Sequence, residues 1–440
     1  MILQLLTCIA VSCIVAKGIY RLYLHPLRKY PGPVFAALSS WYEAYYNIIK
    51  KGGLVVEIER LHRLYGPVIR IGPNTGSVGL CDRQESRDRR ALLGPLFSRR
   101  AVTELEYTIQ EKINVLITLL KEHHSSPSTS VHMSAAYRSL TIDIITSYCF
   151  AESTNALTSG FGNYELESVQ ENLHRLWIQR HFPFIISFAS IAPQRLLLWL
   201  FPDFNSFVEM TAQYERQIDH LTNHPEDFSK VEHETIYHHL FQPKGQERPS
   251  KAALIQEAIT LVGAGSDTVG NACTVGTFYA LKNPSIHRKL VEELCEAWPD
   301  RDRLISFAQL EKLPYLTAFI KETLRFSIGV IHPLPRVVGP TTPEIGGLKL
   351  PSGTVVEMST LFLHMDPDVF PEPHVFNPDR WLTDNTDEMM QDLAPFSKGP
   401  RMCLGINLAW SELYLILGNI FRKLNMTLLD DKDATYCAQL

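Results

Sequence analysis

The sequence predicts a mainly α-helical protein with a minor β part. Residues 251–282 contain no proline and are apolar nearly all round, which is typical of one long helix through a protein core. Apolar side chains also recur at helical spacing in residues 113–120 and 140–145. The β part is expected at residues 346–360, where closely spaced glycines and short apolar runs favour a hairpin. A chain of 440 residues, 45% of them hydrophobic, can bury a large core.

A further helix is predicted to begin at Asn283 and Pro284. Asparagine caps helix N-termini, and proline suits the first helical turn. Ile286, Leu290 and Leu294 then follow on one face. This pattern indicates a surface helix packed on a core.

The first 24 residues predict a membrane anchor. Residues 1–16 are predominantly apolar and are followed by basic residues, beginning with Lys17 and Arg21. Basic residues after the apolar run favour keeping the downstream chain on the cytosolic side of a membrane. A cleaved signal peptide is the alternative, because the apolar run is short for a span of about 20 residues.

The rest of the chain divides into a connector and one predicted domain. Residues 25–34 include Pro26, Pro31 and Pro33, which fix the backbone and remove hydrogen-bond donors, so this segment should be stiff and extended. No repeat, low-complexity tract or flexible linker follows. Residues 35–440 are therefore expected to form a single globular domain.

Charge and cysteine usage exclude several classes of protein. The chain has 42 Lys+Arg and 47 Asp+Glu, a net charge of -5, without the clustered basic surface that a nucleic-acid partner requires. Its eight cysteines are scattered, with no CxxC pair that would suggest a zinc site or a disulfide framework. The adjacent histidine pairs 123–124 and 238–239 make poor metal sites, because neighbouring side chains diverge. A reducing, cytosol-facing compartment fits best.

Glycines and polar residues interrupt the apolar surface of the long helix at residues 251–282. Each of its glycines, at positions 263, 265, 270 and 276, costs about 1 kcal/mol relative to alanine, which indicates a group lying close against the backbone. Asp267 and Thr268 lie beside them, where an unpaired polar group is costly to bury. From these residues alone, two interpretations stay open: helix–helix packing, or a polar notch over a cofactor.

A buried ion network is predicted around Glu322. In IKETLRF, Glu322 and Arg325 are three residues apart on a predicted helix and can share one face. Arg380, between the apolar Phe376 and Trp381, can supply a second guanidinium to the same carboxylate. Such a network would stabilise the core rather than perform chemistry.

Residues 395–410, PFSKGPRMCLGINLAW, contain a cysteine in an unusual context. Cys403 follows a turn at Gly399 and precedes the expected start of a helix, where Gly405 allows close backbone approach. A helix N-terminus lowers a thiol's pKa and favours the metal-binding thiolate. Arg401 can pair with an anionic group of a cofactor. The alternative for a single loop cysteine is a structural role.

These residues resemble the haem-binding signature of the cytochromes P-450, F-x-x-G-x-R-x-C-x-G. Residues 264–268 resemble the family's oxygen-binding helix motif, and the glutamate–arginine pair and residues 376–381 resemble its E-x-x-R network. The likeness extends from near residue 20 to about residue 430 and is similar to filamentous-fungal members of secondary metabolism. The resemblance implies the cytochrome P-450 fold, with a long central helix over haem. The fixed positions of the signature are Phe396, Gly399, Arg401, Cys403 and Gly405.

The resemblance implies haem b, iron protoporphyrin IX, as the cofactor and gives roles to the residues around it. The Cys403 thiolate would be the proximal iron ligand. Thr268 would hydrogen-bond oxygen at the iron, and Asp267 would relay protons from solvent. Gly265 would leave room for dioxygen, and Ala264 would lie near the haem face.

Three arginines are implied as partners of the haem propionates. They are Arg401 in the cysteine loop, Arg336 in HPLPR, and Arg90 in RDRRALLGPLFS. The Arg90 match is incomplete, because Ser86 occupies the position where the family has tryptophan or histidine.

The resemblance also implies partners and a location. Electrons would come from NADPH through a separate flavoprotein reductase, because no flavin or nicotinamide motif occurs in the chain. The reductase would dock on the Cys403 side, where Lys398 and Arg401 are basic. The substrate would be an apolar small molecule, such as a terpenoid or polyketide intermediate. The expected location is the endoplasmic reticulum membrane, with the catalytic domain facing the cytosol.

The sequence departs from the family pattern in two places. It is short at residues 77–89, and it stops soon after LNMTLLDD, where the family continues through a hairpin. The main hypothesis is an active monooxygenase, and the alternative is a haem-binding but catalytically impaired, truncated homologue. A haem isomerase or dehydratase is disfavoured, because the Asp267–Thr268 pair is present.

Overall fold

The computed structural model describes residues 1–73, 83–123, 129–161, 177–178, 180–182, 204–243, 247–340, 344–345, 347–384 and 386–429. The chain forms two compact units, and each is built from segments that are distant in the sequence. Unit 1 combines residues 1–80, 167–197 and 331–362, and unit 2 combines residues 81–166, 198–330 and 363–440. The division is therefore not a break between consecutive domains.

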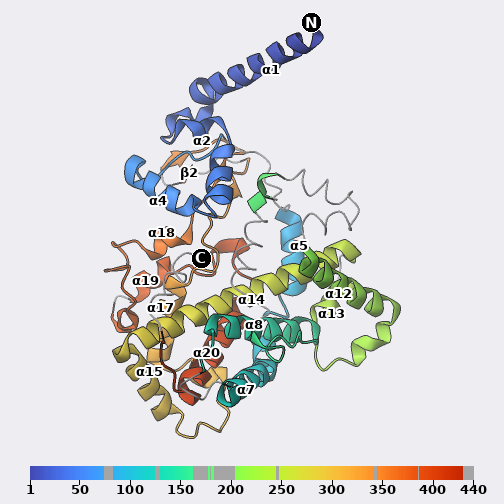
Figure 1. The fold of residues 1–440 in the computed structure, drawn as a ribbon, viewed down its shortest axis with the longest axis vertical. Helices are drawn as coiled ribbons and strands as arrows, with labels where there is room; N and C mark the ends of the chain where they lie inside the picture. The colour runs from blue at the N-terminus through green and yellow to red at the C-terminus, as the bar shows by residue number, and fades with distance from the viewer. Residues whose placement is uncertain are drawn as a thin grey trace. The chain divides into compact units, whose positions relative to one another are not determined.

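Unit 1 begins with an exposed apolar helix, α1 (Ile2–Ile19), drawn in dark blue in Figure 1. It continues into a π-helical turn, Tyr20–Leu24. Among the described residues, one helical stretch, the 21 residues Gln4–Leu24, is long enough and apolar enough to cross a membrane. These bounds agree with an anchor predicted over residues 1–24.

The connector packs within unit 1 through a backbone contact and through the side chain of Leu27, which is buried with Val338 and Leu350. The amide of Arg70 donates to the carbonyl of Pro31 at 2.7 Å. A Cβ at Gly32 would lie 2.2 Å from the Arg70 carbonyl oxygen, so only glycine fits between the two prolines. Short helical elements surround this contact: Pro26–Lys29, α2 (Val34–Leu38), α3 (Trp41–Ala44), the π-helical turn Tyr45–Ile49, and α4 (Leu54–Tyr65).

The β part of unit 1 consists of two antiparallel pairs. In the first, β2 (Glu344–Ile345) pairs with β3 (Leu348–Lys349) across a turn in which Gly347 has φ +77°. In the second, β1 (Arg336–Val337) pairs with β4 (Val355–Val356). The predicted hairpin at residues 346–360 is thus present in part: β3 and β4 lie in that range, but each pairs with an earlier strand.

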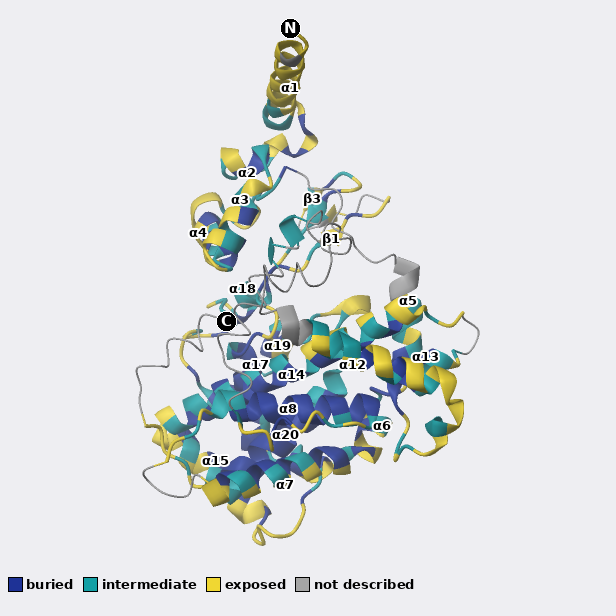
Figure 2. Cartoon of the chain, turned by 45° about the vertical axis from the view of Figure 1, so that its right-hand side comes forward, coloured by how far each residue is buried: buried dark blue, intermediate teal, exposed yellow. Residues whose placement is uncertain are grey.

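Unit 2 is a helical body whose core includes buried residues of α8, α14 and α20, and α8 and α20 are coloured mainly as buried in Figure 2. The predicted helices at residues 113–120, 140–145, 251–282 and 284 onward all form. Its elements are α5 (Arg83–Leu93), α6 (Arg99–Glu104), α7 (Glu106–His123), α8 (Met133–Phe150), α12 (Phe204–Asn223), Pro225–Ser229, α13 (Ile236–Phe241), α14 (Lys251–Lys282), α15 (Pro284–Ala297), α16 (Phe307–Leu310), α17 (Pro314–Phe326), Pro378–Leu382, α19 (Thr386–Asp392), Gly399–Arg401 and α20 (Ile406–Lys423). The chain passes from unit 1 to unit 2 within α18 (Thr360–His364).

The glycines of α14 mark its close contacts with other helices. A Cβ at Gly265 would lie 2.6 Å from the Ile145 side chain of α8. A Cβ at Gly276 would lie 2.9 Å from Oγ1 of Thr323 on α17. The close approach predicted for these glycines is therefore confirmed as helix–helix packing. Gly263 is different, because a Cβ there would meet nothing within 4 Å.

Two alanine substitutions separate packing from helix propensity. We expect Gly265→Ala to lower the free energy of unfolding by about 1–3 kcal/mol, because the methyl group would displace Ile145. Gly263→Ala, two residues away on the same helix, should raise it by up to about 1 kcal/mol, because alanine favours the helix. Chemical denaturation of both variants checks this. Equal effects at the two positions would contradict the packing role of Gly265.

Candidate functional site

The loop before α20 presents Cys403 at a helix N-terminus. The amide of Cys403 donates to the carbonyl of Phe396 at 2.8 Å, and the amide of Met402 donates to that of Gly399 at 3.0 Å. Gly399 has φ +79°, which favours glycine. Gly405 is the N-cap residue of α20, and the thiol is half-buried. The predicted turn, cysteine and helix start are thus all in place.

The protein environment raises the pKa of the Cys403 thiol rather than lowering it. Burial raises this pKa, while a hydrogen bond from the Gly405 backbone and the charge of Arg90 lower it by less. The backbone at the helix start thus acts in the expected direction, and burial outweighs it. A coordinated metal ion favours the deprotonated sulfur.

Arg90 of α5 is a direct structural partner of the cysteine loop. Its Nη1 donates to the carbonyl of Met402 at 2.6 Å. Asn407, in the first turn of α20, donates to the carbonyl of Phe97 at 2.9 Å. These two bonds attach the cysteine loop and the start of α20 to α5 and to the segment that follows it. Arg90 thus lies beside Cys403, although the side chain at Ser86 lies outside the described residues.

The other predicted cofactor residues lie at different depths. Arg401 is exposed on the turn Gly399–Arg401. Phe396 is half-buried, and its ring centroid lies 6.0 Å from that of Trp410 on α20. Arg336 belongs to unit 1, where it is exposed on β1 and donates to the carbonyl of Pro335 at 2.9 Å. The first two therefore share unit 2 with Cys403, whereas Arg336 does not.

Asp267 and Thr268, an acid and an alcohol that we call the acid–alcohol pair, lie in the middle of α14. Oγ1 of Thr268 donates to the carbonyl of Ala264 at 2.8 Å, and Ala264 itself is exposed. Oδ1 of Asp267 lies 3.4 Å from Nε of Arg138 on α8. Burial raises the pKa of Asp267, and Arg138 opposes that shift. Gly265 packs on Ile145 of α8, and its expected role of leaving room for dioxygen stays a prediction.

Glu322 is the centre of the predicted ion network, and Glu322 and Arg325 are both 0% exposed. The carboxylate oxygens of Glu322 accept hydrogen bonds from Nε and Nη2 of Arg325 at 3.0 and 2.8 Å and from Nε of Arg380 at 3.2 Å. Nε1 of Trp381 donates to Oε2 at 2.8 Å, and the Asn377 amide donates to Oε1 at 2.9 Å. The three predicted members therefore meet, and the network also takes in an indole and a backbone amide.

His364 extends this network toward the segment that leads to the cysteine loop. Its Nδ1 lies 3.1 Å from the Arg325 carbonyl, and the Ala394 amide donates to its Nε2 at 2.9 Å. The ring is therefore neutral, with its proton on Nδ1. Desolvation lowers the pKa of His364 to about 4, and a nearby arginine lowers it further while the backbone hydrogen bond opposes the shift.

This histidine predicts a loss of stability in acid. The unfolded chain binds a proton at the ordinary pKa of about 6.5, but folded His364 does not until about pH 4. The contribution of neutral His364 to the free energy of unfolding is therefore fully present above about pH 6.5. It falls by up to about 3 kcal/mol as the pH decreases toward 4. His364→Gln keeps one donor and one acceptor but cannot titrate. Unfolding curves across this range should show a shallower pH dependence for the variant, and an unchanged slope would contradict the assignment.

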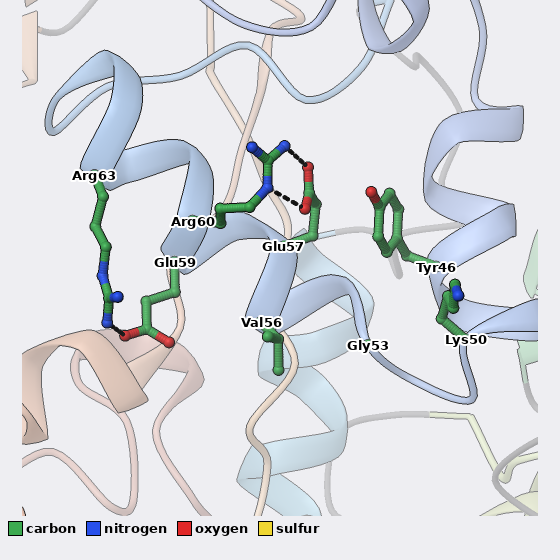
Figure 3. Close-up of a pocket in the computed structure, with 8 residues that line it drawn as sticks. All are labelled: Tyr46, Lys50, Gly53, Val56, Glu57, Glu59, Arg60 and Arg63. Carbon is green, nitrogen blue, oxygen red and sulfur yellow. Dashed lines mark hydrogen bonds and ion pairs between the residues drawn. The ribbon is translucent and has the colours of Figure 1, made fainter.

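Unit 1 has a surface groove of about 450 Å³ next to α4, shown in Figure 3. Tyr46, Lys50 and Val56 line it, together with two ion pairs, Arg60–Glu57 and Arg63–Glu59. Most of its charges satisfy one another, and it contains none of the predicted haem residues. The groove is therefore not the candidate site.

The residues of unit 2 fit a haem. Cys403 offers a half-buried soft sulfur donor. Arg90, bonded to the Met402 carbonyl, and Arg401, two residues before the cysteine, supply positive charge that suits anionic propionates. Among the described residues no cluster of three or more His, Cys, Asp and Glu could hold a metal ion otherwise. Cys403 would hold the haem iron through its sulfur.

Comparison with known proteins gives the family. A sequence model described as Cytochrome P450 matches residues 40–437. Cytochrome P450 monooxygenase sdnE of Sordaria araneosa is 35% identical over 98% of this chain and 92% of its own length. Cytochrome P450 monooxygenase oblB of Cochliobolus heterostrophus is 34% identical over 92% of this chain and 86% of its own. Tryptophan 6-hydroxylase fscE of Fusarium equiseti is 32% identical over 95% of this chain and 89% of its own length.

The fold and site define a haem-thiolate oxidoreductase. The chain belongs to the cytochrome P450 family. Membership implies a haem-iron cofactor, a redox partner, a hydrophobic substrate and monooxygenase activity. The alternative of a truncated, impaired homologue is not borne out, because the match extends to residue 437. The alignment with sdnE spans 484 positions, more than the 440 of this chain, so the relative has additional internal residues. The shortening was predicted at residues 77–89; residues 77–82 lie outside the described residues, and residues 83–89 belong to α5.

Sequence reasoning missed three residues that the structure brings to the site. They are Arg138, His364 and Asn407. The signal for Arg138 was available, because an arginine at helical spacing with Thr141 and Ile145 interrupts an otherwise apolar helix face. The other two contact backbone carbonyls and amides that are distant in sequence, and no local pattern predicts such contacts.

Proposed function

We propose that the protein is a membrane-anchored monooxygenase that contains haem b and receives electrons from NADPH through a separate flavoprotein reductase. It inserts one oxygen atom from dioxygen into an apolar intermediate of a fungal secondary-metabolite pathway. The observation that carries the proposal is the cysteine loop, with Cys403 at the start of α20 and Arg90 bonded to the Met402 carbonyl. The acid–alcohol pair of α14 supports oxygen chemistry rather than haem storage.

Haem b, when bound, supplies the oxygen activation and the oxygen-atom transfer. Cys403 would hold the iron, and Arg90 and Arg401 would pair with the propionates; Arg336 of unit 1 is a third candidate. Phe396, Gly399 and Gly405 shape the loop that presents the thiolate. Ala264 would adjoin the haem face as a small apolar residue.

The chain's own chemical contribution is proton transfer. Thr268 holds a proton at Oγ1, which now donates to the Ala264 carbonyl. Asp267 has a side chain that is 47% exposed, so solvent can deliver a proton to it. A carboxyl of raised pKa exchanges protons more readily near neutral pH than an ordinary aspartate does. Asp267 can therefore replace the proton that Thr268 gives up, and it recovers its own from water.

We infer that the anchor holds the protein at the endoplasmic reticulum, with units 1 and 2 in the cytosol. Support comes from the apolar stretch Gln4–Leu24, with Lys17 and Arg21 near its C-terminal end and Arg28 and Lys29 just beyond. Exposed Arg401 and Lys398 give the cysteine loop positive charge that an acidic reductase surface would complement.

We propose a terpenoid or polyketide intermediate as the substrate, which the resemblance to enzymes of fungal secondary metabolism supports. Tryptophan 6-hydroxylase fscE and N-acetyltryptophan 6-hydroxylase ivoC, both 32% identical to this chain, add an indole amino acid as a second candidate.

Reconstitution tests the function. The full-length protein in lipid vesicles, mixed with a fungal reductase and NADPH, is supplied with terpenoid, polyketide and tryptophan pools, and products are analysed by mass spectrometry. We expect a product heavier by one oxygen, labelled by ¹⁸O₂. A protein that binds haem through a thiolate but consumes no NADPH with any pool would contradict the proposal.

A further inference from the structure

Arg138 of α8 is a buried cation that none of the sequence motifs assigns. Its side chain is 7% exposed, and its Nε lies 3.4 Å from Oδ1 of Asp267. Its Nη1 is buried without a hydrogen-bond partner among the described residues. A buried guanidinium is costly unless a negative group compensates it. Asp267 is the carboxylate in position to do so.

Two further contacts fix Arg138 opposite Asp267. Oγ1 of Thr141, one turn later on α8, donates to the Ser266 carbonyl at 2.6 Å. A Cβ at Gly270 would lie 3.3 Å from both Cγ and the backbone nitrogen of Arg138, so the glycine lets α8 approach α14 there. The register of the two helices at Asp267 is therefore set from α8.

We propose that Arg138 is a positioning residue for the proton relay: it holds the Asp267 carboxylate on the α8 side of α14 and keeps it available to exchange protons. The inference rests on the proposed function, because it concerns the same site. Asp267 takes one proton from solvent and passes one to Thr268 Oγ1 as that hydroxyl gives up its own. The carboxylate is regenerated in each cycle, so protons balance without a further reactant.

No other charged group competes with Arg138 for Asp267 among the described residues. Asp143, also on α8, accepts hydrogen bonds from Thr154, Ala156 and Leu157 instead. Glu257, earlier on α14, pairs with Arg89 of α5 at 2.6 Å. Glu412 of α20 raises the pKa of Cys273 and has no effect on that of Asp267.

The chemical consequence depends on the sign of each effect. Burial raises the pKa of Asp267, and the guanidinium lowers it by favouring the charged form. Without Arg138, the carboxyl would bind its proton more tightly and release it at a higher pH. A relay group works best when its pKa lies near the operating pH. Loss of Arg138 should therefore change the pH dependence of oxygen consumption, not only its rate.

A double-mutant cycle tests the pairing without using activity. Thermal unfolding of the full-length holoenzyme is measured for wild type, Arg138→Met, Asp267→Asn and the double variant, at about pH 5 and about pH 8. We expect Arg138→Met to lower Tm more at the higher pH, where it leaves an uncompensated carboxylate, and Asp267→Asn to remove this difference. Additive effects at both pH values would overturn the proposal.

The relay is tested with dioxygen as the electron acceptor. Reductase-driven NADPH oxidation and hydrogen peroxide yield are measured against pH, in H₂O and D₂O. We expect the midpoint of the pH dependence of these two rates to move to higher pH in Arg138→Met and to move less in Arg138→Lys. In Asp267→Asn this pH-dependent transition should disappear. Arg89→Met is the matched control, because it removes a different ion pair of α14, the pair of Arg89 with Glu257, in which the arginine side chain is 42% exposed. The pH midpoint of this variant should stay at the wild-type value.

The outcomes separate the two proposals. An Arg138→Met holoenzyme with a normal thiolate spectrum and a wild-type midpoint would overturn the role of Arg138. A wild-type protein that lacks the thiolate spectrum would overturn the proposed function, while the unfolding cycle would still report whether Arg138 and Asp267 are coupled.

Discussion

Replacing Cys403 by alanine should abolish the thiolate-type carbon monoxide spectrum and all NADPH-driven product formation. Cys403 presents its thiol just before the N-terminus of α20, and by the proposed function this sulfur holds the haem iron. Removing one ligand from a site that has one protein ligand removes the site. The measurement is the reduced carbon monoxide difference spectrum of the full-length protein, together with haem content.

Matched controls decide whether the effect is specific. Cys295 is exposed on α15, so Cys295→Ala should leave the spectrum unchanged. Cys403→Ser retains the size of the side chain and replaces sulfur by oxygen, a harder ligand. We expect haem content to fall in Cys403→Ser and the thiolate-type band to be lost. Retention of that band in either Cys403 variant would assign the iron ligand to another residue.

Much of unit 2 follows from local sequence signals. The absence of proline over residues 251–282 predicted α14 with the bounds that it has, and Asn283 caps α15 as predicted, with its side chain accepting from the Ser285 amide. These signals succeed because helix caps and apolar periodicity act over a few residues. The Cys403 loop was equally local, since turn, thiol and helix start lie within ten residues.

The contacts between distant segments were harder to predict. Four glycines indicated that something approaches α14, but the sequence did not show that Ile145 is the neighbour of Gly265. The pKa of the Cys403 thiol shows the same limit: the helix start that lowers it is local in the sequence, whereas the burial that outweighs this effect comes from packing with distant segments. Arg138 belongs to the same class, because its importance depends on the register between α8 and α14.

Glu322→Gln should cause the largest loss of stability of any single substitution considered. The carboxylate accepts from two guanidiniums, an indole and a backbone amide at a site with 0% exposure. An amide at this position removes the negative charge and points an N–H group at donors. Breaking a buried ion pair costs about 3–5 kcal/mol, which is a large part of the 5–15 kcal/mol that stabilises a typical domain.

Because a loss of this size lowers the yield of folded protein, two milder variants accompany Glu322→Gln. Trp381→Phe removes one hydrogen bond to Oε2 and should cost about 1–3 kcal/mol. Glu292→Gln breaks the exposed Arg288–Glu292 pair, in which both side chains are 69% exposed, and should cost less than about 0.5 kcal/mol. Denaturant unfolding gives these differences, and a Trp381→Phe effect as small as that of Glu292→Gln would contradict a tightly packed network.

The same variants test how the network serves the haem site. Glu322 binds α17 to residues 377–381, and His364 joins Arg325 to Ala394, two residues before Phe396. Phe396 in turn accepts from the Cys403 amide. A continuous chain of hydrogen bonds and short backbone links therefore runs from the ion network to the iron ligand. We expect Trp381→Phe to lower haem retention in proportion to its loss of stability, with the thiolate spectrum of the remaining holoenzyme unchanged, because the network supports the loop without touching the sulfur.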